Sequence, residues 1–432
     1  MPKNTYAVDI EHITRVEGHG NIRLNVKDGK IEELNLDIVE APRFFEMMLK
    51  GRSYEHAAPL TSRICGICSI AHTLASIYAT ERALGIIPSE QTKKLRDLVY
   101  CGETIASHVL HICFLVVPDI FKTDSVIPLA STHPDLVKLA LRLKKLGNEM
   151  CNILVGRKIH SISLMVKGFS RIPTKDEIAK VQKMLKESIV DIETLVKFIK
   201  TAKLPDFERE TEYISLKHNT VFPLLEGEIY SSDTKETYKN EDYLSITNEY
   251  CPKNSTSKWT RHKRNSYMVG SLARLNNNFN LLHPKAKDVA EFLGFKVPCF
   301  NPFMNNIAQA IETVHEAYFG IELCEMLLCK DLEEEDLTIK PRAGRGVGII
   351  EAPRGILFHD YTYDEKGKIT KANCIIPTGQ NYGNIQDDLN ALVPAILDMS
   401  KEDIALHMEM LVRAYDPCIS CSVHLLNVEF VD

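Results

Sequence analysis

Apolar and polar residues alternate in three runs near the start of the chain, at residues 6–10, 21–26 and 31–39. This alternation is typical of strands with one buried face. Asp28 and Gly29 separate the second and third runs and favour a hairpin turn. The chain is therefore expected to open with an antiparallel sheet. The same strand pattern returns at residues 346–350, 355–361 and 369–376, with a hairpin turn at 365–368.

Elsewhere, apolar residues recur every three or four positions, which predicts amphipathic helices. The predicted helices span residues 44–51, 69–84, 89–115, 134–154, 175–204, 284–292, 305–330 and 401–415. Together the two patterns predict an α+β fold, in which a central bundle of long helices is flanked by small antiparallel sheets.

We expect one intertwined unit over residues 1–432 rather than separable domains. Residues 207–264 are polar, with short strand candidates and no clear helix, so 207–283 is interpreted as a peripheral insertion. The remaining parts are an N-terminal β region (1–43), a helical core in two pieces (44–206 and 284–340), a β region (341–400), and a C-terminal helix with a tail (401–432).

The charge balance excludes several function classes. Lys and Arg number 52 against 58 Asp and Glu, a net charge of -6, which gives no basic surface for nucleic acid. The longest apolar runs are too short and too interrupted to span a bilayer. The first residues carry no apolar signal segment, so we expect a cytoplasmic protein with no membrane span.

Of the 12 cysteines, four form pairs at metal-ligand spacing: Cys65 with Cys68, and Cys418 with Cys421. Without an export signal, thiolates for metal or redox chemistry are expected rather than disulfides. The first pair precedes a predicted helix, whose N-terminus lowers thiol pKa values. Four sulfurs suit a soft or borderline metal, and tetrathiolate zinc is the commonest use of two such pairs. Two unrelated pairs are the other alternative, but both pairs adjoin long helices and further charged residues.

The residues around the two pairs are more specific than the spacing alone. The segments Arg63-Ile64-Cys65-Gly66-Ile67-Cys68, with His72, and Asp416-Pro417-Cys418-Ile419-Ser420-Cys421-Ser422-Val423-His424 resemble the two signature motifs of the large subunit of nickel-iron hydrogenases. Arg15-Val16-Glu17-Gly18-His19 and Glu351-Ala352-Pro353-Arg354-Gly355 resemble two further motifs of that family. The resemblance covers essentially the whole chain, and it is strongest to the cytosolic, multi-subunit sulfhydrogenase-type α subunits.

The resemblance implies an enzyme that reversibly cleaves dihydrogen into protons and electrons. Nickel would be held by Cys65, Cys68, Cys418 and Cys421. Cys68 and Cys421 would also bridge to an iron that carries carbonyl and cyanide ligands. Cys418 would be the first proton acceptor and Glu17 the next, although a glutamate at a strand end is otherwise an ordinary surface residue.

Further residues acquire roles from the same resemblance. Arg354 would lie over the open metal position with Asp416 and Asp119, although Asp119 also suits a plain helix cap. His72 lies one helical turn after Cys68 and is expected to hydrogen-bond the bridging sulfur. The resemblance places the following residues around the iron ligands: Pro353, Arg354, Pro377 and Thr378. For Pro377 and Thr378 an ordinary β-turn is equally compatible with the sequence.

A second metal ion, magnesium or iron, is implied near the C-terminus. Its protein ligands would be Glu46, a backbone carbonyl at Cys374, and His424. Glu46 otherwise fits a solvated helix face. His108, His111 and His160 are expected to support the wall of the pocket without binding a metal.

The chain has no further cysteine cluster for iron–sulfur centres, and its Gly344-x-Gly346-x-Gly348 segment lacks the spacing of a dinucleotide-binding loop. The expected partners are therefore an iron–sulfur small subunit, flavin, NAD(P) or other electron-transfer subunits, nickel chaperones, and a maturation protease that removes residues 425–432. The acceptor would be a soluble one such as NAD(P) or polysulfide. The alternatives are a hydrogen sensor with the same metals and a zinc-structured binding protein. A metal-free subunit of a respiratory complex is disfavoured because all four cysteines are present.

Overall fold

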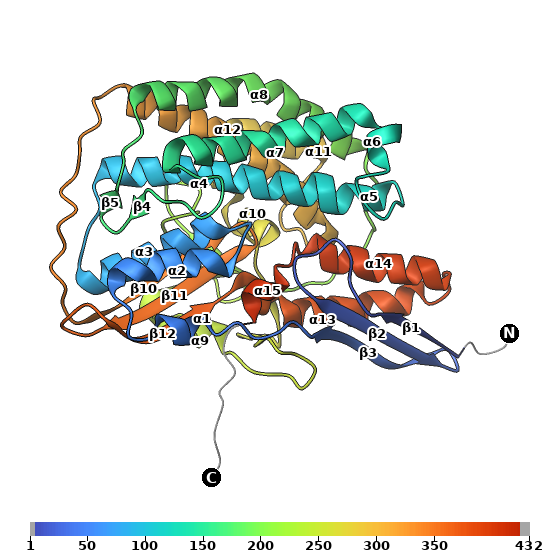
Figure 1. The fold of residues 1–432 in the computed structure, drawn as a ribbon. Coiled ribbons are helices and arrows are strands. Elements are labelled where there is room, and N and C mark those ends of the chain that lie inside the picture. Colours follow the sequence, from blue (N-terminus) through green and yellow to red (C-terminus); the bar gives the residue numbers. More distant parts are fainter. Residues whose placement is uncertain (1–4, 424–432) are drawn as a thin grey trace, which may run out of the picture.

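The computed structural model describes residues 5–423, and His424 with the tail after it lies outside that range. The predicted α+β fold is confirmed. Long helices lie side by side in layers above two small antiparallel sheets (Figure 1). The N-terminal sheet has the order β1-β2-β3 and the strand bounds Tyr6–Ile10, Gly20–Lys27 and Lys30–Ile38. In β2, every second side chain is buried, as the sequence pattern predicts.

The helical layers are built from α4 (Glu90–Leu110), α7 (Pro134–Val155), α8 (Lys175–Thr201) and α12 (Asn305–Leu328). α4 packs between α7 and α12, and α8 covers α12. The α4–α7 crossing is close, because a Cβ atom on Gly147 would lie 2.3 Å from the carbonyl oxygen of Gly102. Glycine at this crossing therefore lets the two helices approach backbone to backbone.

One segment, Glu90–Ile120, is long and apolar enough to cross a membrane, but 83% of its most apolar window is buried inside the protein. It is a core segment of the fold. It is also not one regular helix, since a π-helical stretch, His111–Val116, separates α4 from the short α5 (Val117–Ile120). The apolar period did not predict this change, which commonly marks functional sites.

A second sheet has the order β10-β11-β12, with bounds Gly344–Ala352, Gly355–Tyr363 and Ile369–Ile375. Helix α3 (Ser69–Leu84) lies across β10 and β11. The first cysteine pair immediately precedes α3, so this sheet is the platform on which that half of the site stands.

Residues 207–283, interpreted as a peripheral insertion, contain the expected short strands together with helical segments. The segment forms a four-stranded sheet of order β8-β7-β6-β9 and the helix α10 (Ser271–Asn278). The bounds of its strands are β6 (Glu212–Lys217), β7 (Glu228–Ser231), β8 (Thr237–Tyr238) and β9 (Tyr267–Met268). Ile214 and Leu216 share a hydrophobic core with Val347 and Phe358 of the β10–β11 hairpin. Part of its polar composition is buried rather than exposed: the hydroxyl of Thr211 donates to Asn384 and that of Ser231 donates to Glu212.

The region 341–400 also differs from the expected β region, because it ends in a 20-residue helix, α13 (Pro377–Ile396). Pro377 and Thr378 open this helix instead of forming a β-turn. Gly379 and Gly383 weaken the helical signal, and the first turns bury polar side chains such as Gln380 that hydrogen-bond other segments.

The remaining elements are short or lie at the two ends of the fold. The bounds of the helices are α1 (Phe45–Leu49), α2 (Tyr54–Thr61), α6 (Leu129–Thr132), α9 (Leu244–Thr247), α11 (Pro284–Leu293), α14 (Lys401–Ala414) and α15 (Ile419–Ser422). A two-stranded ribbon joins β4 (Leu164–Met165) to β5 (Gly168–Phe169). α15, from the end of the chain, packs on α13, and its Ile419 lies against Gly20 at the start of β2.

Candidate metal centre

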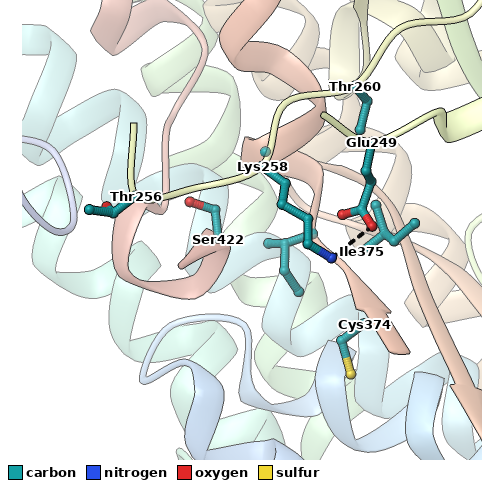
Figure 2. Close-up of a pocket in the computed structure, with 9 residues that line it drawn as sticks. Glu249, Thr256, Lys258, Thr260, Cys374, Ile375 and Ser422 are labelled. Atoms are coloured by element: carbon teal, nitrogen blue, oxygen red, sulfur yellow. Dashed lines mark hydrogen bonds and ion pairs between the residues drawn. The ribbon is translucent and has the colours of Figure 1, made fainter. Parts of the chain in front are cut away.

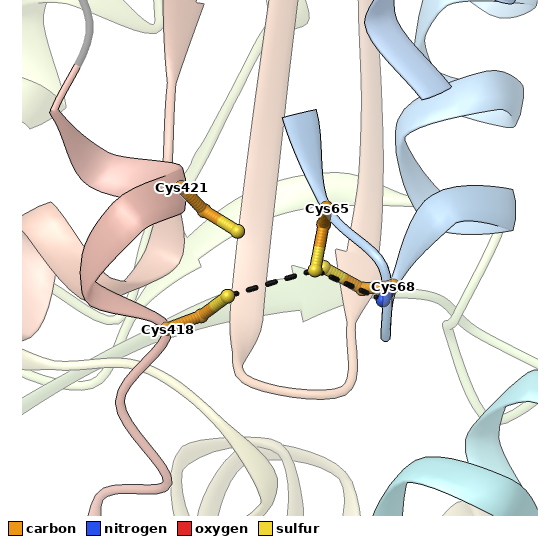
Figure 3. Close-up of side chains that lie close together, drawn as sticks. All are labelled: Cys65, Cys68, Cys418 and Cys421. Atoms are coloured by element: carbon orange, nitrogen blue, oxygen red, sulfur yellow. Dashed lines mark hydrogen bonds between the residues drawn. The ribbon is translucent and has the colours of Figure 1, made fainter. Parts of the chain in front are cut away.

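Four cysteines from the two ends of the chain meet in the interior. The sulfur atoms of Cys65, Cys68, Cys418 and Cys421 lie within 4.8 Å of one another, and all four residues are buried. The two pairs face each other across the site, with Cys65 Sγ 3.6 Å from Cys418 Sγ (Figure 3). Within residues 5–423, no other group of three or more His, Cys, Asp or Glu side chains has a comparable geometry.

The first pair is shaped by its own backbone. The amides of Ile67 and Cys68 both donate to Cys65 Sγ at 3.2 Å, and Cys68 is the residue that precedes α3. The first turn of α3 is in turn held by Glu103 of α4, whose carboxylate accepts from the amides of Ile70 and Ala71 at 2.6 and 2.7 Å. Cys65 is thereby placed in a nest of donors that favours its thiolate.

The second pair is held by residues from distant segments. The amide of Cys418 donates to Thr378 Oγ1 at 2.9 Å, and the amide of Ile419 donates to the carbonyl of Glu17 at 2.8 Å. Asp416 has a positive φ of 51°, which turns the chain from α14 into the motif. Because α15 has only four residues, these contacts position the second pair, whereas a long helix follows the first pair.

The four thiols form a set that fits a soft cation. Hydrogen bonding with Cys418 lowers the pKa of Cys65 well below its usual value. Hydrogen bonding with the other thiols raises the pKa of Cys418, and burial raises that of Cys421, both well above their usual values. Four crowded sulfurs cannot all ionise without a cation, and thiolate ligands select soft or borderline metals. The donor set therefore fits a nickel centre.

Glu17 lies against the second pair, as the resemblance implied. Its Oε2 is 3.1 Å from Cys418 Sγ and 3.1 Å from the amide of Ser420, and the Ser420 hydroxyl donates to Oε1. A Cβ on Gly18, which has a φ of +84°, would lie 2.6 Å from the Ser420 nitrogen, so glycine allows this close approach. The Glu17 carboxylate is thus fixed within proton-transfer distance of a cysteine sulfur.

Arg354 projects from the β10–β11 turn into the same interior. Its Nη2 donates to Asp416 Oδ1 at 2.8 Å and its Nη1 lies 3.4 Å from Ser107 Oγ. Burial opposes its charge, but Asp416 and the cysteine sulfurs outweigh burial and raise the pKa of Arg354 well above its usual value. The Arg354–Asp416 pair is therefore a fixed, buried cation held by one carboxylate.

Asp119 is not placed beside Arg354 by any contact in the described residues. Its carboxylate is bound by Arg413 at 2.7 and 2.9 Å and by Arg15 at 2.5 Å. It is also the third residue of α5, not the cap of a helix. Since Arg413 precedes the second cysteine pair, Asp119 anchors the segment that delivers it.

His72 lies one turn along α3 from Cys68, is buried, and burial lowers its pKa to about 4. Its Nδ1 lies 3.1 Å from Nε2 of His359 on β11. His359 was not expected from the sequence, because a single histidine within a strand of apolar residues carries no signal for this contact. Pro353, Pro377 and Thr378 are all buried around the same interior.

Arg43 is a further residue without a sequence signal. Its guanidinium donates to the carbonyls of Ile64 at 2.7 Å, Arg63 at 3.0 Å and Ser420 at 3.3 Å. Its amide donates to the carbonyl of Val423 at 2.9 Å. One side chain thus connects the segments that carry the two cysteine pairs.

The three histidines expected in the pocket wall take different places. His108 pairs with Glu312 at 2.9 Å, and His111 lies between Gln309 and the carbonyl of Arg413 at 2.5 and 2.7 Å. His160 is half-buried, and its amide donates to Ser69 Oγ at 3.0 Å. His108 and His111 are thus core residues on the Arg354 side, whereas His160 lies nearer the surface.

The predicted second metal region is a small polar pocket of about 20 Å³ between Cys374, Ser422, Glu249 and Lys258 (Figure 2). Glu46 is buried, and its carboxylate accepts a hydrogen bond from the Cys374 amide at 2.8 Å. Burial raises the pKa of the Glu46 carboxyl. Glu46 and Cys374 are therefore brought together, not on a solvated face. His424, the third predicted ligand, lies outside the described residues.

Comparisons with known proteins point to one family. A profile of the nickel-dependent hydrogenases matches residues 43–128 and 225–424, and a profile described as HoxL-like matches residues 7–41. Sulfhydrogenase 1 subunit alpha of Pyrococcus furiosus is 34% identical over 428 residues, which cover 99% of this chain and 100% of the relative. NAD-reducing hydrogenase HoxS subunit beta of Cupriavidus necator is 28% identical over 468 residues, covering 97% and 94% of the two chains.

Among solved structures, an NAD+-reducing [NiFe]-hydrogenase in the H2-reduced state matches with a TM-score of 0.87 and 27% identity. The match covers 98% of this chain and all of that one. A [NiFeSe]-hydrogenase of Dm. baculatum shares the fold, with a TM-score of 0.77 and 23% identity over 98% of this chain and 100% of the other.

Proposed function

The chain belongs to the nickel-dependent hydrogenase family, as the catalytic large subunit of a nickel-iron enzyme acting on dihydrogen, and on this premise we propose how its residues divide the work. Membership sets aside the alternative of a zinc-structured binding protein. The observation that carries the proposal is the 3.1 Å contact between Glu17 and Cys418 at the edge of a buried four-sulfur site.

We propose that Cys65, Cys68, Cys418 and Cys421 would hold the nickel and that Cys68 and Cys421 would also hold the iron, with its carbonyl and cyanide ligands. When bound, the centre polarises dihydrogen and accepts its electrons. The buried thiols supply soft ligands and exclude water, so the charges that surround the site act at low dielectric. The hydroxyl oxygen of Thr378 accepts a hydrogen bond from the Cys418 amide. The hydroxyl hydrogen of Thr378 therefore stays available to donate to an iron ligand.

The proton leaves through Cys418 and Glu17. The thiolate takes the proton released at the centre and passes it from Sγ to the Glu17 carboxylate over 3.1 Å. The amide and hydroxyl of Ser420 hold that carboxylate in place, so transfer requires no search for the acceptor. Glu17 is half-buried and its neighbour His19 is exposed, so the next step can reach solvent.

Arg354 supplies a fixed positive charge over the reacting position, and Asp416 orients it. Asp119 acts one step further away, by binding Arg413 at the start of the second motif. Pro353 and Pro377 complete an apolar rim around the iron ligands. His72 tunes the bridging sulfur of Cys68.

A magnesium ion, or iron, is proposed between Glu46, the carbonyl of Cys374 and His424. Glu46 already lies against the Cys374 backbone, next to a pocket of about one water in size. The ion would secure the end of the chain after a maturation protease has removed residues 425–432 and nickel chaperones have delivered the metal.

The relatives are named as subunits of larger enzymes, so electrons leave through partners. We propose that an iron–sulfur small subunit docks where the first pair comes nearest the surface, at exposed Arg63 and Gly66. A cavity of about 350 Å³ lined by Arg63 and His160 adjoins this point, with exposed Ile162 on its rim. Further flavin or NAD(P) subunits would pass electrons to a soluble cytoplasmic acceptor such as NAD(P) or polysulfide.

Catalysed isotope exchange between D2 gas and the protons of water, measured on the purified complex, tests this division of work. Glu17→Gln keeps the shape of the side chain but cannot accept a proton, so exchange should fall by about 10²–10⁴-fold while nickel content stays unchanged. Glu11→Gln, an exposed glutamate earlier in the same loop, is the matched control and should behave as wild type. Wild-type exchange in Glu17→Gln would contradict the proposed proton route.

A further inference from the structure

Arg354 lies at the tip of the β10–β11 hairpin, where a two-residue turn, Pro353-Arg354, joins the two strands. The direction of its side chain therefore depends on the two peptide units that precede it. Asp416 and Ser107 contact only the outer nitrogens of the guanidinium, and among the described residues Nε has no hydrogen-bond partner. These outer contacts leave the base of the side chain to be fixed by the backbone of the turn.

A second buried arginine, Arg274 of α10, holds both of those peptide units. Its Nη1 donates to the carbonyl of Ala352 at 2.9 Å, and its Nη2 donates to the carbonyl of Pro353 at 3.1 Å. Each carbonyl lies in the plane of the peptide unit that follows it. One guanidinium thus fixes the two planes from which the Arg354 side chain projects.

The turn also packs directly on the residue that precedes α10. A Cβ on Gly355, which has a φ of +130°, would lie 2.8 Å from the nitrogen of Gly270. A Cβ on Gly270, which has a φ of +118°, would lie 3.2 Å from the carbonyl oxygen of Arg354. Glycine permits both the backbone angles and the close approach. The start of α10 is therefore a fixed support for the turn.

Two buried carboxylates hold Arg274 itself. Glu312 of α12 accepts from Nε at 2.6 Å and from Nη2 at 2.7 Å, and Glu351 accepts from Nη1 at 3.0 Å. Burial opposes the charge of Arg274, but Glu312 and Glu351 outweigh burial and raise its pKa. A buried ion cluster is often no more stabilising than apolar side chains of the same volume, so stability alone does not account for this one.

Helix α12 also supports the carboxylate that Arg354 binds. Gln309, three residues before Glu312 and on the same side of the helix, donates to Asp416 Oδ2 at 3.0 Å. Arg354 binds the other oxygen, Oδ1, at 2.8 Å. One side of α12 therefore positions Asp416 directly and positions the turn of Arg354 through Arg274.

We infer that Arg274 is a positioning residue for the hydrogenase reaction, which fixes the Pro353-Arg354 turn so that the Arg354 guanidinium stays over the reacting position. This inference rests on the proposed role of Arg354 and deepens it. The planar fork of an arginine binds two carboxylates and two carbonyls at once, which the single nitrogen of a lysine cannot do. Arg274 acts on the centre only through the turn.

Arg274→Lys tests the inference, because lysine keeps the positive charge between the two glutamates. The carbonyls of Ala352 and Pro353 lose their shared donor and the turn shifts, so kcat should fall about 10²-fold at wild-type nickel content. Glu351→Gln is a milder second variant, since it loosens the same Nη1 that binds Ala352, and it should lower kcat by less. Wild-type kcat in both variants would overturn the inference.

Arg96→Lys is the matched control. Arg96 is as buried as Arg274, forms two hydrogen bonds to Glu81 and donates to the carbonyl of Met165, but has no hydrogen bond to the turn in the described residues. Both lysine variants disturb a buried ion pair, so a general loss of stability affects both. Only Arg274→Lys should lower kcat per nickel, and equal falls in the two variants would overturn the inference.

Arg354→Lys separates a failure of the inference from a failure of the proposed function. If Arg274 acts through Arg354, adding Arg274→Lys to Arg354→Lys should cause no further fall in kcat. A further fall of about 10²-fold in the double variant would overturn the inference. Wild-type kcat in Arg354→Lys alone would instead contradict the proposed role of Arg354.

A crystal structure of the Arg274→Lys complex gives a readout that is independent of turnover. The bond between Arg354 Nη2 and Asp416 Oδ1, 2.8 Å in the wild type, should be lost or split between two side-chain positions. The same bond should persist in Arg96→Lys. An unchanged bond in Arg274→Lys would show that the turn keeps its place without the guanidinium of Arg274, which would overturn the inference.

Discussion

The two halves of the metal centre have the same CxxC spacing but are built in different ways. Cys65 and Cys68 precede a 16-residue helix that lies on a sheet, and their local geometry comes from neighbouring backbone amides. Cys418 precedes a four-residue helix that contains Cys421, and the pair takes its position from Glu17, Thr378 and other distant groups. The first half is a rigid platform, and the second is a short segment docked onto it.

This difference indicates where chemistry and where stability reside. The platform side contributes buried packing and one histidine, His72, whose pKa is lowered by burial. The docked side carries the proposed proton acceptor and the Asp416 partner of Arg354. Arg43 contacts both sides, so it connects the docked segment to the platform.

Loss of a metal ligand should give the largest loss of nickel and activity, and the loss should be equally severe in both halves of the site. Cys65→Ser and Cys418→Ser should both lose nickel and reduce hydrogenase activity to background, because either change breaks the tetrathiolate set. Cys113→Ala, a buried cysteine outside the site, should retain nickel. Nickel at wild-type content in either serine variant would contradict the ligand assignment.

Gly346→Ala should damage the platform. The new Cβ would lie 2.1 Å from the carbonyl of Ala79, so α3 must move off the sheet at a cost of about 1–3 kcal/mol, or more. The urea midpoint of unfolding measures this loss. Gly66→Ala meets nothing within 4 Å and should unfold at the wild-type midpoint. Equal midpoints in the two variants would show that the close helix–strand approach is not important for stability.

Arg43→Met should undock the second half while sparing the platform. Three carbonyls lose their donor, at about 1–3 kcal/mol for each group left buried, so nickel should dissociate faster on addition of a chelator. The exposed Arg52→Met is the control. Unchanged nickel release from Arg43→Met would mean that the two halves are not connected by this side chain.

Thr378→Val should give the smallest effect. It removes the acceptor of the Cys418 amide, which costs about 1–3 kcal/mol locally, and lowers activity modestly. Thr378→Ser keeps the hydroxyl, so it should retain both the acceptor of the Cys418 amide and the wild-type activity. If the serine and valine variants behave alike, the hydroxyl has no role in placing Cys418.

Much of the fold and the core of the site follow from the sequence, because their signals are local. The alternation in β2 and β3, the apolar period of α8, and the CxxC spacing each depend on neighbours in the chain. Helix α13 did not follow, since polar side chains in its first turns are buried by hydrogen bonds to distant segments. Gln380, for example, donates to the carbonyl of Ile356.

The partners of individual site residues were the least predictable. Asp119 carries a charge that suits Arg354, yet Arg413 and Arg15 lie closer to it in the folded chain. Arg43 and His359 have no distinctive neighbours in sequence, and their roles arise only where separate segments meet. Three-dimensional proximity, not residue type, decides these pairings.

The most direct test of the central account is metal analysis and infrared spectroscopy of the same active sample of the purified complex. Four thiolates from the two ends of the chain are predicted to hold nickel beside an iron, so the sample should contain nickel and at least as much iron, with carbonyl and cyanide stretches from the iron. An active sample that contains zinc in place of nickel and shows no such stretches would contradict the account.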